Sequence, residues 1–512
     1  MSAAGTLPVV VLDSAVDSLL EGIQIALSWP IVGFLVVGLL LGIVLGALPG
    51  IGSPVGMAIV LPLTVPFDAT PALILLISIY SGAMFGGSIA AILLNAPGTE
   101  SAAATTLDGY PMAQQGLAKN ALAIATTASA LNGFAAAVLL ILISPILIEV
   151  VLAFGSPEYF LLAILGISLI TIVAEGSIMK GIVAGALGFM ISTIGVAIMS
   201  ASPRYTFGSL ALYDGLDFVA ALIGMFAFAE MMKLAVKTKI AQDAVGISGS
   251  ITDGIKTVFK YPKTTIKGGI LGMVIGAVPG SGATTSTFVA YAEEARSSAA
   301  DGRFGEGDPR GIIAPEGANN PTVSGSLVPT LSFGIPGSGS TAVLLGGILM
   351  HGLQPGPQLF GEQLQITYSL FVAVFLGNFI ILAVGYTIIP YASAITKLDT
   401  DVIIPMVIVL SFIGAFSLNR NWFDAFGVLA LGILGYYMVK YNYSVIAFVL
   451  GIVLGPIAEE NFFRSLQISG GEYTIFISPQ RPLSLGISIL IFLVLVGPFL
   501  GPKVRGAIDG LR

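Results

Sequence analysis

Two motifs rich in glycine and proline occur twice in this chain, each inside apolar sequence. The first pair is GALPGIG at residues 46–52 and GAVPGSG at residues 276–282, which lie 230 residues apart. The second pair is NAPGTES at residues 95–101 and GIPGSGS at residues 334–340, in which Pro336 follows Pro97 by 239 residues. Two motif pairs in the same order predict an internal duplication.

Such motifs offer binding chemistry because proline and glycine interrupt helices and leave backbone groups without intrahelical partners. The starting end of a half-helix presents amide donors and a positive dipole end, which suit a carboxylate or a phosphate. The ending half-helix presents carbonyl oxygens, which suit Na⁺. Breaks at matching places in two apolar halves are typical of the binding site of a secondary transporter.

Small hydroxyl and amide side chains surround the motifs and could bind carboxylate oxygens or complete the shell of an alkali ion. Alternatively, the hydroxyls bond to carbonyls of their own helices. Neither motif contains Arg or Lys, so an anion would be bound by dipoles, amides and a co-bound cation. The predicted substrate-binding residues are Ser53, Asn95, Gly98, Thr99, Ser101, Ser281, Thr284, Asn319, Asn320, Gly337, Ser338 and Ser340. The predicted cation-binding residues are Pro49, Gly50, Gly52, Glu100, Pro279, Gly280 and Gly282.

Several polar residues near the motifs allow more than one interpretation. Glu100 is either a proton carrier or ion ligand, or a carboxylate at the aqueous mouth of its loop. Asn319 and Asn320 either line an entrance or bind substrate oxygens, or they form a turn with an asparagine cap. His351 is the only histidine, and we expect it to pack or to act as a hinge at a helix end.

The sequence predicts no enzyme, no catalytic residue, no metal site and no cofactor other than the coupling cation, Na⁺ or H⁺. It contains no cysteine, no Walker A motif, no HExxH, no GxSxG and no paired aspartate-rich run. Without an ATPase motif, transport would be driven by ion gradients. The basic residues are few and dispersed, which argues against a nucleic-acid partner.

The composition places these motifs in a membrane. Of the 512 residues 55% are hydrophobic and 10% charged, and the mean hydropathy of +0.97 is far above that of a soluble globule. Continuous apolar stretches approach the roughly 20 residues that a helix needs to cross the bilayer and argue against a barrel. We therefore predict an all-α polytopic membrane protein of about 12–14 membrane segments, in two repeat-related halves with broken or re-entrant helices.

Five parts are predicted along the chain: an amphipathic segment at 1–29, a first membrane repeat at 30–236, a linker at 237–267, a second repeat at 268–503 and a tail at 504–512. The N-terminal segment would lie on the membrane, on a partner or against the rest of the chain. The linker has six Lys and two Asp, which predicts a cytoplasmic location. The polar stretch 292–320 is expected to be an aqueous loop or lid, and 120–154 is long enough for two spans. Charges expected at helix ends are Glu175, Lys180 and Glu230.

The motifs resemble those of the large membrane subunit of the tripartite tricarboxylate transporters. The resemblance rests on the motifs at 46–52 and 95–99, DGYPMA at 108–113, APE at 314–316, the pair Asn319 and Asn320, GIPGS at 334–338 and HGLQPGP at 351–357. It covers residues 35–360 by motif and the remainder by the order and length of segments.

This resemblance implies a permease of the bacterial inner membrane that takes up carboxylates such as citrate, coupled to Na⁺ or H⁺. It implies two protein partners: a small membrane subunit of about four helices, and an extracytoplasmic solute-binding protein. It also implies that the Pro-Gly loops bind substrate and cation. Two alternatives stay open from the residues alone: a stand-alone ion channel or antiporter, and a scaffold subunit that transports nothing.

Overall fold

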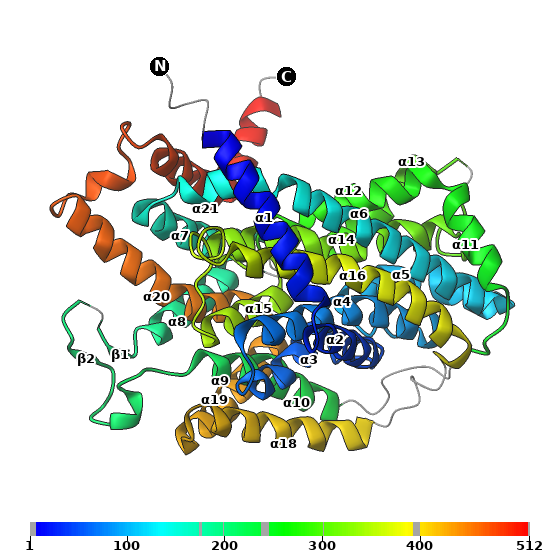
Figure 1. Cartoon of the computed structure of the whole chain (residues 1–512), viewed down its shortest axis with the longest axis horizontal. Coiled ribbons are helices and arrows are strands. Elements are labelled where there is room, and N and C mark those ends of the chain that lie inside the picture. Colours follow the sequence, from blue (N-terminus) through cyan, green and yellow to red (C-terminus); the bar gives the residue numbers. More distant parts are fainter. Residues whose placement is uncertain are drawn as a thin grey trace.

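The computed structural model describes residues 7–173, 177–197, 199–236, 245–300, 302–392 and 400–509, and it is almost entirely helical (Figure 1). The strands in this part are β1 (Gly195–Val196) and β2 (Pro203–Arg204), which form one short antiparallel hairpin. Seven of the described helices are long and apolar enough to cross a membrane, or eight with a pair bent by 69° near residues 27–31. The predicted all-α polytopic membrane fold is confirmed. Glu175 lies outside the described residues.

The first half begins with α1, which packs against α16 of the second half. Contact of this segment with the membrane or a partner stays a prediction. Its helices are α1 (Leu7–Leu27), α2 (Ile31–Gly46), α3 (Gly52–Val60), α4 (Ala69–Leu94), α5 (Ala103–Met112), α6 (Ala118–Leu152), α7 (Ser156–Val173), α8 (Ile178–Ser192), α9 (Phe218–Leu222) and α10 (Ala229–Ala235). Short 3₁₀ or π turns are η1 (Leu61–Thr64), η2 (Glu100–Ala102), η3 (Ala113–Leu117), η4 (Leu210–Leu212) and η5 (Ile223–Phe228).

The second half follows the same order of broken helices. Its elements are α11 (Ile251–Lys260), α12 (Pro262–Gly276), α13 (Gly282–Ser297), α14 (Arg310–Phe333), α15 (Gly339–Met350), α16 (Leu364–Ile388), η6 (Ile389–Tyr391), α18 (Thr400–Asn419), α19 (Trp422–Lys440), α20 (Val445–Ile468), η7 (Tyr473–Phe476) and α21 (Pro482–Asp509). In Figure 1 α4, α6, α14 and α16 lie in the centre, and α18 and α19 run along the lower edge.

Three sequence expectations differ from the observed elements. Residues 120–152 of the stretch 120–154 belong to one helix, α6, which continues through Pro145. The stretch 292–320 is not a loop throughout: it holds the end of α13 and the first half of α14, whose polar residues are buried by neighbouring helices. The linker 237–267 contains α11 and the start of α12, while its residues 237–244 lie outside the described part.

Closely packed helix pairs form the centre of each half, and glycines permit the approach. A Cβ added to any of these glycines would lie closer than 3.0 Å to a backbone oxygen of the facing helix. In the α2–α4 pair the glycine and oxygen positions are Gly38 with Leu75, Gly42 with Ile79, and Gly46 with Ala83. In the α12–α14 pair they are Gly268 with Ala314, Gly272 with Ala318, and Gly276 with Thr322. Each glycine of the second pair lies 230 residues after its counterpart in the first, and each residue that supplies the oxygen lies 239 residues after its counterpart. These are the same offsets that separate the motifs.

The two halves also interlock. Helix α1 contacts α16, while α11, which likewise precedes a glycine-rich helix, contacts α6. Helices α7 and α8 of the first half pack on α20, and α18 and α19 of the second half pack on η5. Neither half therefore forms a separate unit.

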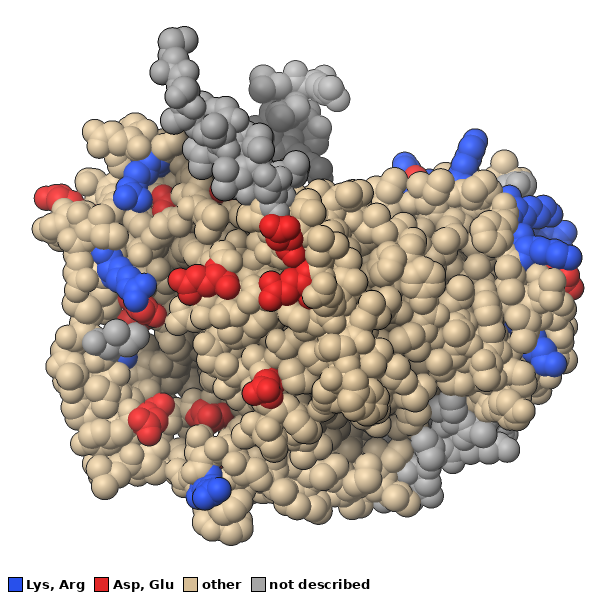
Figure 2. All heavy atoms as spheres, in the orientation of Figure 1, with Lys and Arg blue, Asp and Glu red and all other residues tan. Residues whose placement is uncertain are grey.

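Basic side chains gather at one end of the molecule, on the right in Figure 2, over α11–α13 as placed in Figure 1. The sequence supplies Lys256, Lys260, Lys263 and Lys267 there. Several carboxylates and fewer cations face the viewer at the other end. The cytoplasmic location of the basic end stays a prediction from its charge.

Candidate functional site

Each repeated motif lies at a break between two helices. The motifs at 46–52 and 276–282 separate α2 from α3 and α12 from α13, and Gly50 and Gly280 adopt φ values of 86° and 77°. Helices α4 and α14 end in left-handed residues, Asn95 and Gly334, with φ values of 53° and 68°. Left-handed backbone terminates a helix, so the sequence motifs correctly predict where the chain breaks.

The two breaks of each half are joined by the same hydrogen bond. The amide of Gly52 donates to the carbonyl of Gly98 over 3.2 Å, and the amide of Gly282 donates to the carbonyl of Gly337 over 3.1 Å. In both cases the donor begins a half-helix and the acceptor belongs to the second Pro-Gly loop. The predicted loops therefore meet in space within each half.

The half-helices also pair across the halves at their starting ends. The hydroxyls of Ser53 on α3 and Ser340 on α15 lie 2.6 Å apart and are buried. On the other side, Thr287 Oγ1 of α13 donates to the carbonyl of Ser101 in η2 over 2.9 Å. Each pair thus combines one half-helix from each half.

The same pairs also contact each other further along the helices. Thr64 Oγ1, just after α3, lies 3.1 Å from His351 Nε2, just after α15. Tyr291 on α13 donates to Asp108 Oδ2 on α5 over 2.9 Å. These successive contacts show that α3 runs beside α15 and that α13 runs beside α5. The resulting arrangement brings the half-helix starts of the four motifs into two adjacent clusters.

The two clusters differ in exposure. Ser53 and Ser340 are 4% and 2% exposed, so the α3–α15 start is closed. Around the other cluster Thr284 is half-buried, while Asn95 and Glu100 are exposed. Glu100 is therefore exposed on the surface of the chain, and both of its interpretations stay predictions.

Some predicted site hydroxyls bond within their own segment. Ser281 Oγ donates to the carbonyls of Ile275 and Val278, the latter over 2.8 Å, which satisfies the end of α12. Ser338 caps α15 in a reciprocal capping box with Thr341. Ser338 also lies 3.4 Å from Tyr80 OH, and Thr99 Oγ1 lies 3.0 Å from Ser101 Oγ. Capping accounts for Ser281 without a ligand.

The adjacent asparagines diverge, because successive residues on a helix point about 100° apart. Asn319 donates to the carbonyl of Met84 on α4 over 2.9 Å, whereas Asn320 donates to Asn378 Oδ1 on α16 over 2.9 Å. Both are buried inside α14, so the expectation of a turn is wrong, while a role in lining an entrance or binding substrate oxygens stays a prediction. Among the described residues, the Oδ1 atoms of both lack a hydrogen-bond partner.

The predicted cation ligands lie at the breaks 46–52 and 276–282, except Glu100, which lies in the 95–101 motif. Pro49 is buried, Gly50, Gly52, Pro279, Gly280 and Gly282 are half-buried, and Glu100 is exposed. Within the described residues no group of three His, Cys, Asp or Glu side chains could hold a metal ion. An alkali ion at the breaks would thus depend on carbonyl and hydroxyl oxygens, and its site stays a prediction.

Sequence reasoning missed a buried carboxylate next to this site. Glu316 on α14 is 0% exposed and accepts hydrogen bonds from Ser88 on α4 and Thr105 on α5. The signal was present in the sequence, since Glu316 lies between proline and glycine close to a motif. It was misread because the whole stretch 292–320 was expected to be aqueous.

A second carboxylate holds the loop that leads into α14. Asp108 Oδ1 accepts the backbone amides of Gly305, Gly307 and Asp308 over 2.8–2.9 Å. Asp308 in turn forms an ion pair with Arg310 at 2.9 Å. Burial raises the pKa of Asp308, but hydrogen bonds and charge from Arg310 outweigh it and hold the pKa below its usual value.

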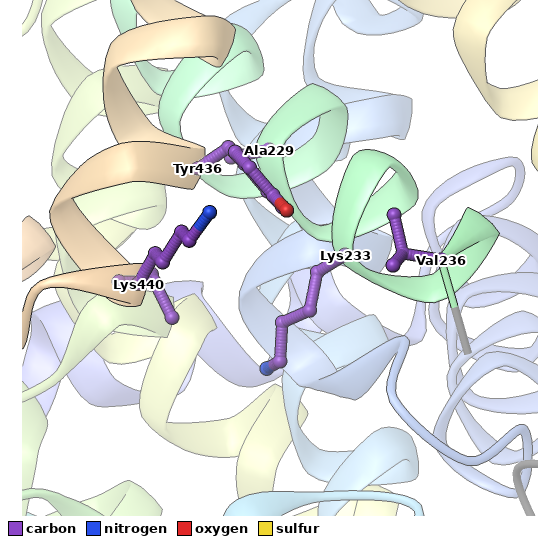
Figure 3. A pocket seen from close by; sticks show the side chains of 6 residues that line it. Ala229, Lys233, Val236, Tyr436 and Lys440 are labelled. Atoms are coloured by element: carbon purple, nitrogen blue, oxygen red, sulfur yellow. The ribbon is translucent and has the colours of Figure 1, made fainter.

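A surface hollow of about 260 Å³ lies elsewhere, between the ends of α10 and α19 (Figure 3). Figure 3 shows the Lys440 side chain reaching toward Tyr436 while Lys233 points away. Its lining contains no residue of the four motifs and consists of Ala229, Lys233, Val236, Tyr436, Val439 and Lys440.

Comparison with known proteins finds a matching family and two similar proteins. The model of the tripartite tricarboxylate transporter TctA family matches residues 32–450. An uncharacterized 52.8 kDa protein in the TAR-I ttuC' 3' region of Agrobacterium vitis is 32% identical over 456 residues, 88% of this chain and 90% of that protein. An uncharacterized protein in the TAR-II ttuC' 3' region of the same organism is 28% identical over 233 residues, 45% of this chain and 96% of that protein. No solved structure matches the chain.

Proposed function

Because the chain belongs to the tripartite tricarboxylate transporter TctA family, we propose that it takes up tricarboxylates or related carboxylates, driven by a Na⁺ or H⁺ gradient. The plain consequence of membership is narrower: the chain is a multi-pass membrane component of a tricarboxylate transporter. The substrate, the coupling ion and the supply of substrate by an extracytoplasmic binding protein belong to the proposal.

The pairing of the four broken helices is the observation that carries this function. Starting ends of half-helices present amide donors and positive dipole ends, which suit carboxylates. The hydrogen bonds from Gly52 to Gly98 and from Gly282 to Gly337 hold these ends together. The side chains of Ser53, Thr99 and Ser340 add hydroxyl groups beside them. Without a basic residue in the motifs, a co-bound cation would offset the substrate charge.

We further propose that the two sets of helices are repeat-related and move as one transport body. Support comes from matching glycine contacts, matching hydrogen bonds and the mixed pairing of half-helices. The α3–α15 start is closed, while Asn95 and Glu100 beside the other cluster are exposed. Such asymmetry between equivalent positions is what one state of an alternating-access cycle would present.

The proposed partners and membrane location are inferred from membership of the family. Two partners are expected, a small membrane subunit and an extracytoplasmic solute-binding protein, in the inner membrane of a bacterium. The exposed apolar side chains on α18, such as Val402 and Val409, are compatible with lipid or with a membrane partner. A channel, an antiporter and an inert scaffold remain the competing functions.

Uptake of labelled citrate into vesicles tests the proposal. The vesicles contain this chain and the small membrane subunit, and the binding protein is added or withheld under an imposed Na⁺ or H⁺ gradient. Uptake that needs both the gradient and the binding protein is expected. Vesicles that contain the folded protein but accumulate neither citrate nor any carboxylate recognised by the binding protein would refute the proposal. Ion flux without the binding protein would favour the channel or antiporter.

A further inference from the structure

Glu316 lies in a fully buried part of the protein, in the first third of α14. Its side chain is 0% exposed, although the helix around it contains Pro315 and Pro321. The carboxylate bridges the two halves, because its hydrogen-bond donors Ser88 and Thr105 belong to α4 and α5 of the first half. A carboxylate in such a place is costly to ionise unless charge or water compensates it.

The two oxygens of Glu316 have different surroundings. Oε1 accepts Ser88 Oγ at 2.6 Å and Thr105 Oγ1 at 2.5 Å. Among the described residues Oε2 has one distant donor, Asn319 Nδ2 at 3.4 Å. All three partners are neutral, so none supplies the positive charge that buried carboxylates usually need. Oε2 is therefore the oxygen on which a proton can reside without displacing a short hydrogen bond.

Acidic groups on the elements packed against α14 are engaged elsewhere. Asp108 on α5 binds the 305–308 backbone and Tyr291, and Glu294 on α13 pairs with Lys267 of α12 at 2.7 Å. Glu100 in η2 is exposed. None of them shares a described hydrogen bond or ion pair with Glu316.

Basic and phenolic groups on the same elements are likewise engaged or remote. Arg310 at the start of α14 pairs with Asp308. Tyr80 on α4 contacts Ser338. On α16, Tyr368 contacts Ser144 and Tyr386 contacts Thr127. His351, which follows α15, contacts Thr64. Lys119 on α6 and Lys263 on α12 have no described contact with Glu316. The Glu316 carboxylate thus has no cationic side chain beside it in the described structure.

We propose that Glu316 is a proton-binding site and that its proton drives carboxylate uptake, an inference that rests on the proposed function. Protonation converts the buried carboxylate into a neutral acid, with the added hydrogen on Oε2. The neutral acid fits the enclosed state seen here, whereas release of the proton needs a conformation in which water or a cation reaches the group.

A short chain of contacts connects this proton site to the substrate-binding loops. Asn319, beside Oε2, donates to the carbonyl of Met84. Ser101 Oγ lies 3.7 Å from Met84 Sδ and 3.0 Å from Thr99 Oγ1. Ser101 O in turn accepts Thr287 of α13. A change in charge at Glu316 would therefore act on residues only a few contacts from the NAPGTES break.

Infrared spectra of the purified full-length chain test proton binding without any transport assay. An exposed glutamate is ionised at about pH 6, so a protonated-carboxyl C=O band at that pH marks a buried acid. We expect this band in the wild type, its loss in Glu316→Gln, and its retention in Glu294→Gln, a matched variant of another buried carboxylate. A band that survives in Glu316→Gln would overturn the proposal.

Transport in vesicles then tests coupling. With the small subunit and binding protein present, an imposed pH gradient should accelerate uptake in the wild type and in Glu294→Gln. Glu316→Gln should lose this acceleration while keeping exchange of internal for external substrate. If that variant fails to fold, Glu316→Asp should keep both the band and a pH-driven rate.

Two outcomes separate this inference from the function on which it rests. If Glu316→Gln loses Na⁺-driven uptake but keeps pH-driven uptake, the carboxylate binds Na⁺ and the proton assignment is wrong. If the spectra identify Glu316 as a protonated acid but the wild type transports no carboxylate, the proposed function fails while the proton site is supported.

Discussion

Gly98 packs directly on the carbonyl oxygen of Gly46, so closely that a Cβ on Gly98 would overlap that oxygen. Gly98 thereby lets the second Pro-Gly loop reach the end of α2, and its own carbonyl accepts the amide of Gly52. In the second half, a Cβ on Gly337 would lie 3.0 Å from the carbonyl oxygen of Gly276. Close approach of the paired breaks thus depends on glycine in both halves. The space left for a side chain is smaller at Gly98 than at Gly337.

This difference predicts unequal effects of alanine. Gly98→Ala should destabilise the protein by about 3 kcal/mol or prevent folding, because the facing backbone cannot move away cheaply. Gly337→Ala should cost about 1 kcal/mol. Thermal unfolding of the purified variants measures both, and equal losses would contradict the contact geometry. Gly427→Ala is the control: its added Cβ meets no atom within 4 Å, so in helix α19 it should stabilise by about 0.5–1 kcal/mol.

The hydroxyl pair of Ser53 and Ser340 should behave as one energetic unit. Each serine-to-alanine variant is expected to lose about 1 kcal/mol, because the remaining hydroxyl is buried without its partner. The double variant should lose less than the sum of the singles, with a coupling of about 0.5–1 kcal/mol. Unfolding measurements on the wild type, the two single variants and the double variant give this coupling. Strict additivity would show that the two half-helices do not contact in solution, and Ser417→Ala, at an exposed hydroxyl, serves as the unaffected reference.

Asp108 is expected to hold the loop before α14 in place. Asp108→Asn removes the charge that attracts three backbone amides and the Tyr291 hydroxyl, and each charge-assisted bond contributes about 1.5–3 kcal/mol. Amide hydrogen exchange at residues 303–308 should therefore quicken by tenfold or more, an energy of about 1.4 kcal/mol. Asp214→Asn, at an exposed carboxylate, should leave this exchange unchanged. Unaltered exchange in Asp108→Asn would mean that other contacts hold the loop.

Acid should release the same loop through Asp308. Its folded-state pKa is lowered from 3.8, so its ion pair with Arg310 stabilises the loop above that unfolded value. The stabilisation is lost as the pH falls through the lower folded value. Hydrogen exchange, corrected for its intrinsic pH dependence, should thus show protection down to about pH 4 and a loss below it. Asp308→Asn should show weaker protection at neutral pH and no such acid transition; a transition that persists would assign it to another carboxylate.

Sequence patterns were reliable for local backbone events. Proline and glycine alter the backbone where they stand, so the four breaks fall at the predicted motifs. The long apolar stretches were enough to predict a polytopic membrane protein, because crossing a bilayer depends mainly on the length and hydropathy of a segment. The same patterns failed for 292–320, because polarity there is satisfied by other helices rather than by water.

What the sequence by itself determined is therefore the membrane class, the places where helices break and the small residues beside them. Only the tertiary structure decided which breaks meet, because the contact of Ser53 with Ser340 joins residues 287 positions apart. It also decided that Asn319 and Asn320 face different helices and that Glu316 is enclosed by neutral donors. Burial and pairing are properties of neighbours brought together by folding, and no local pattern encodes them.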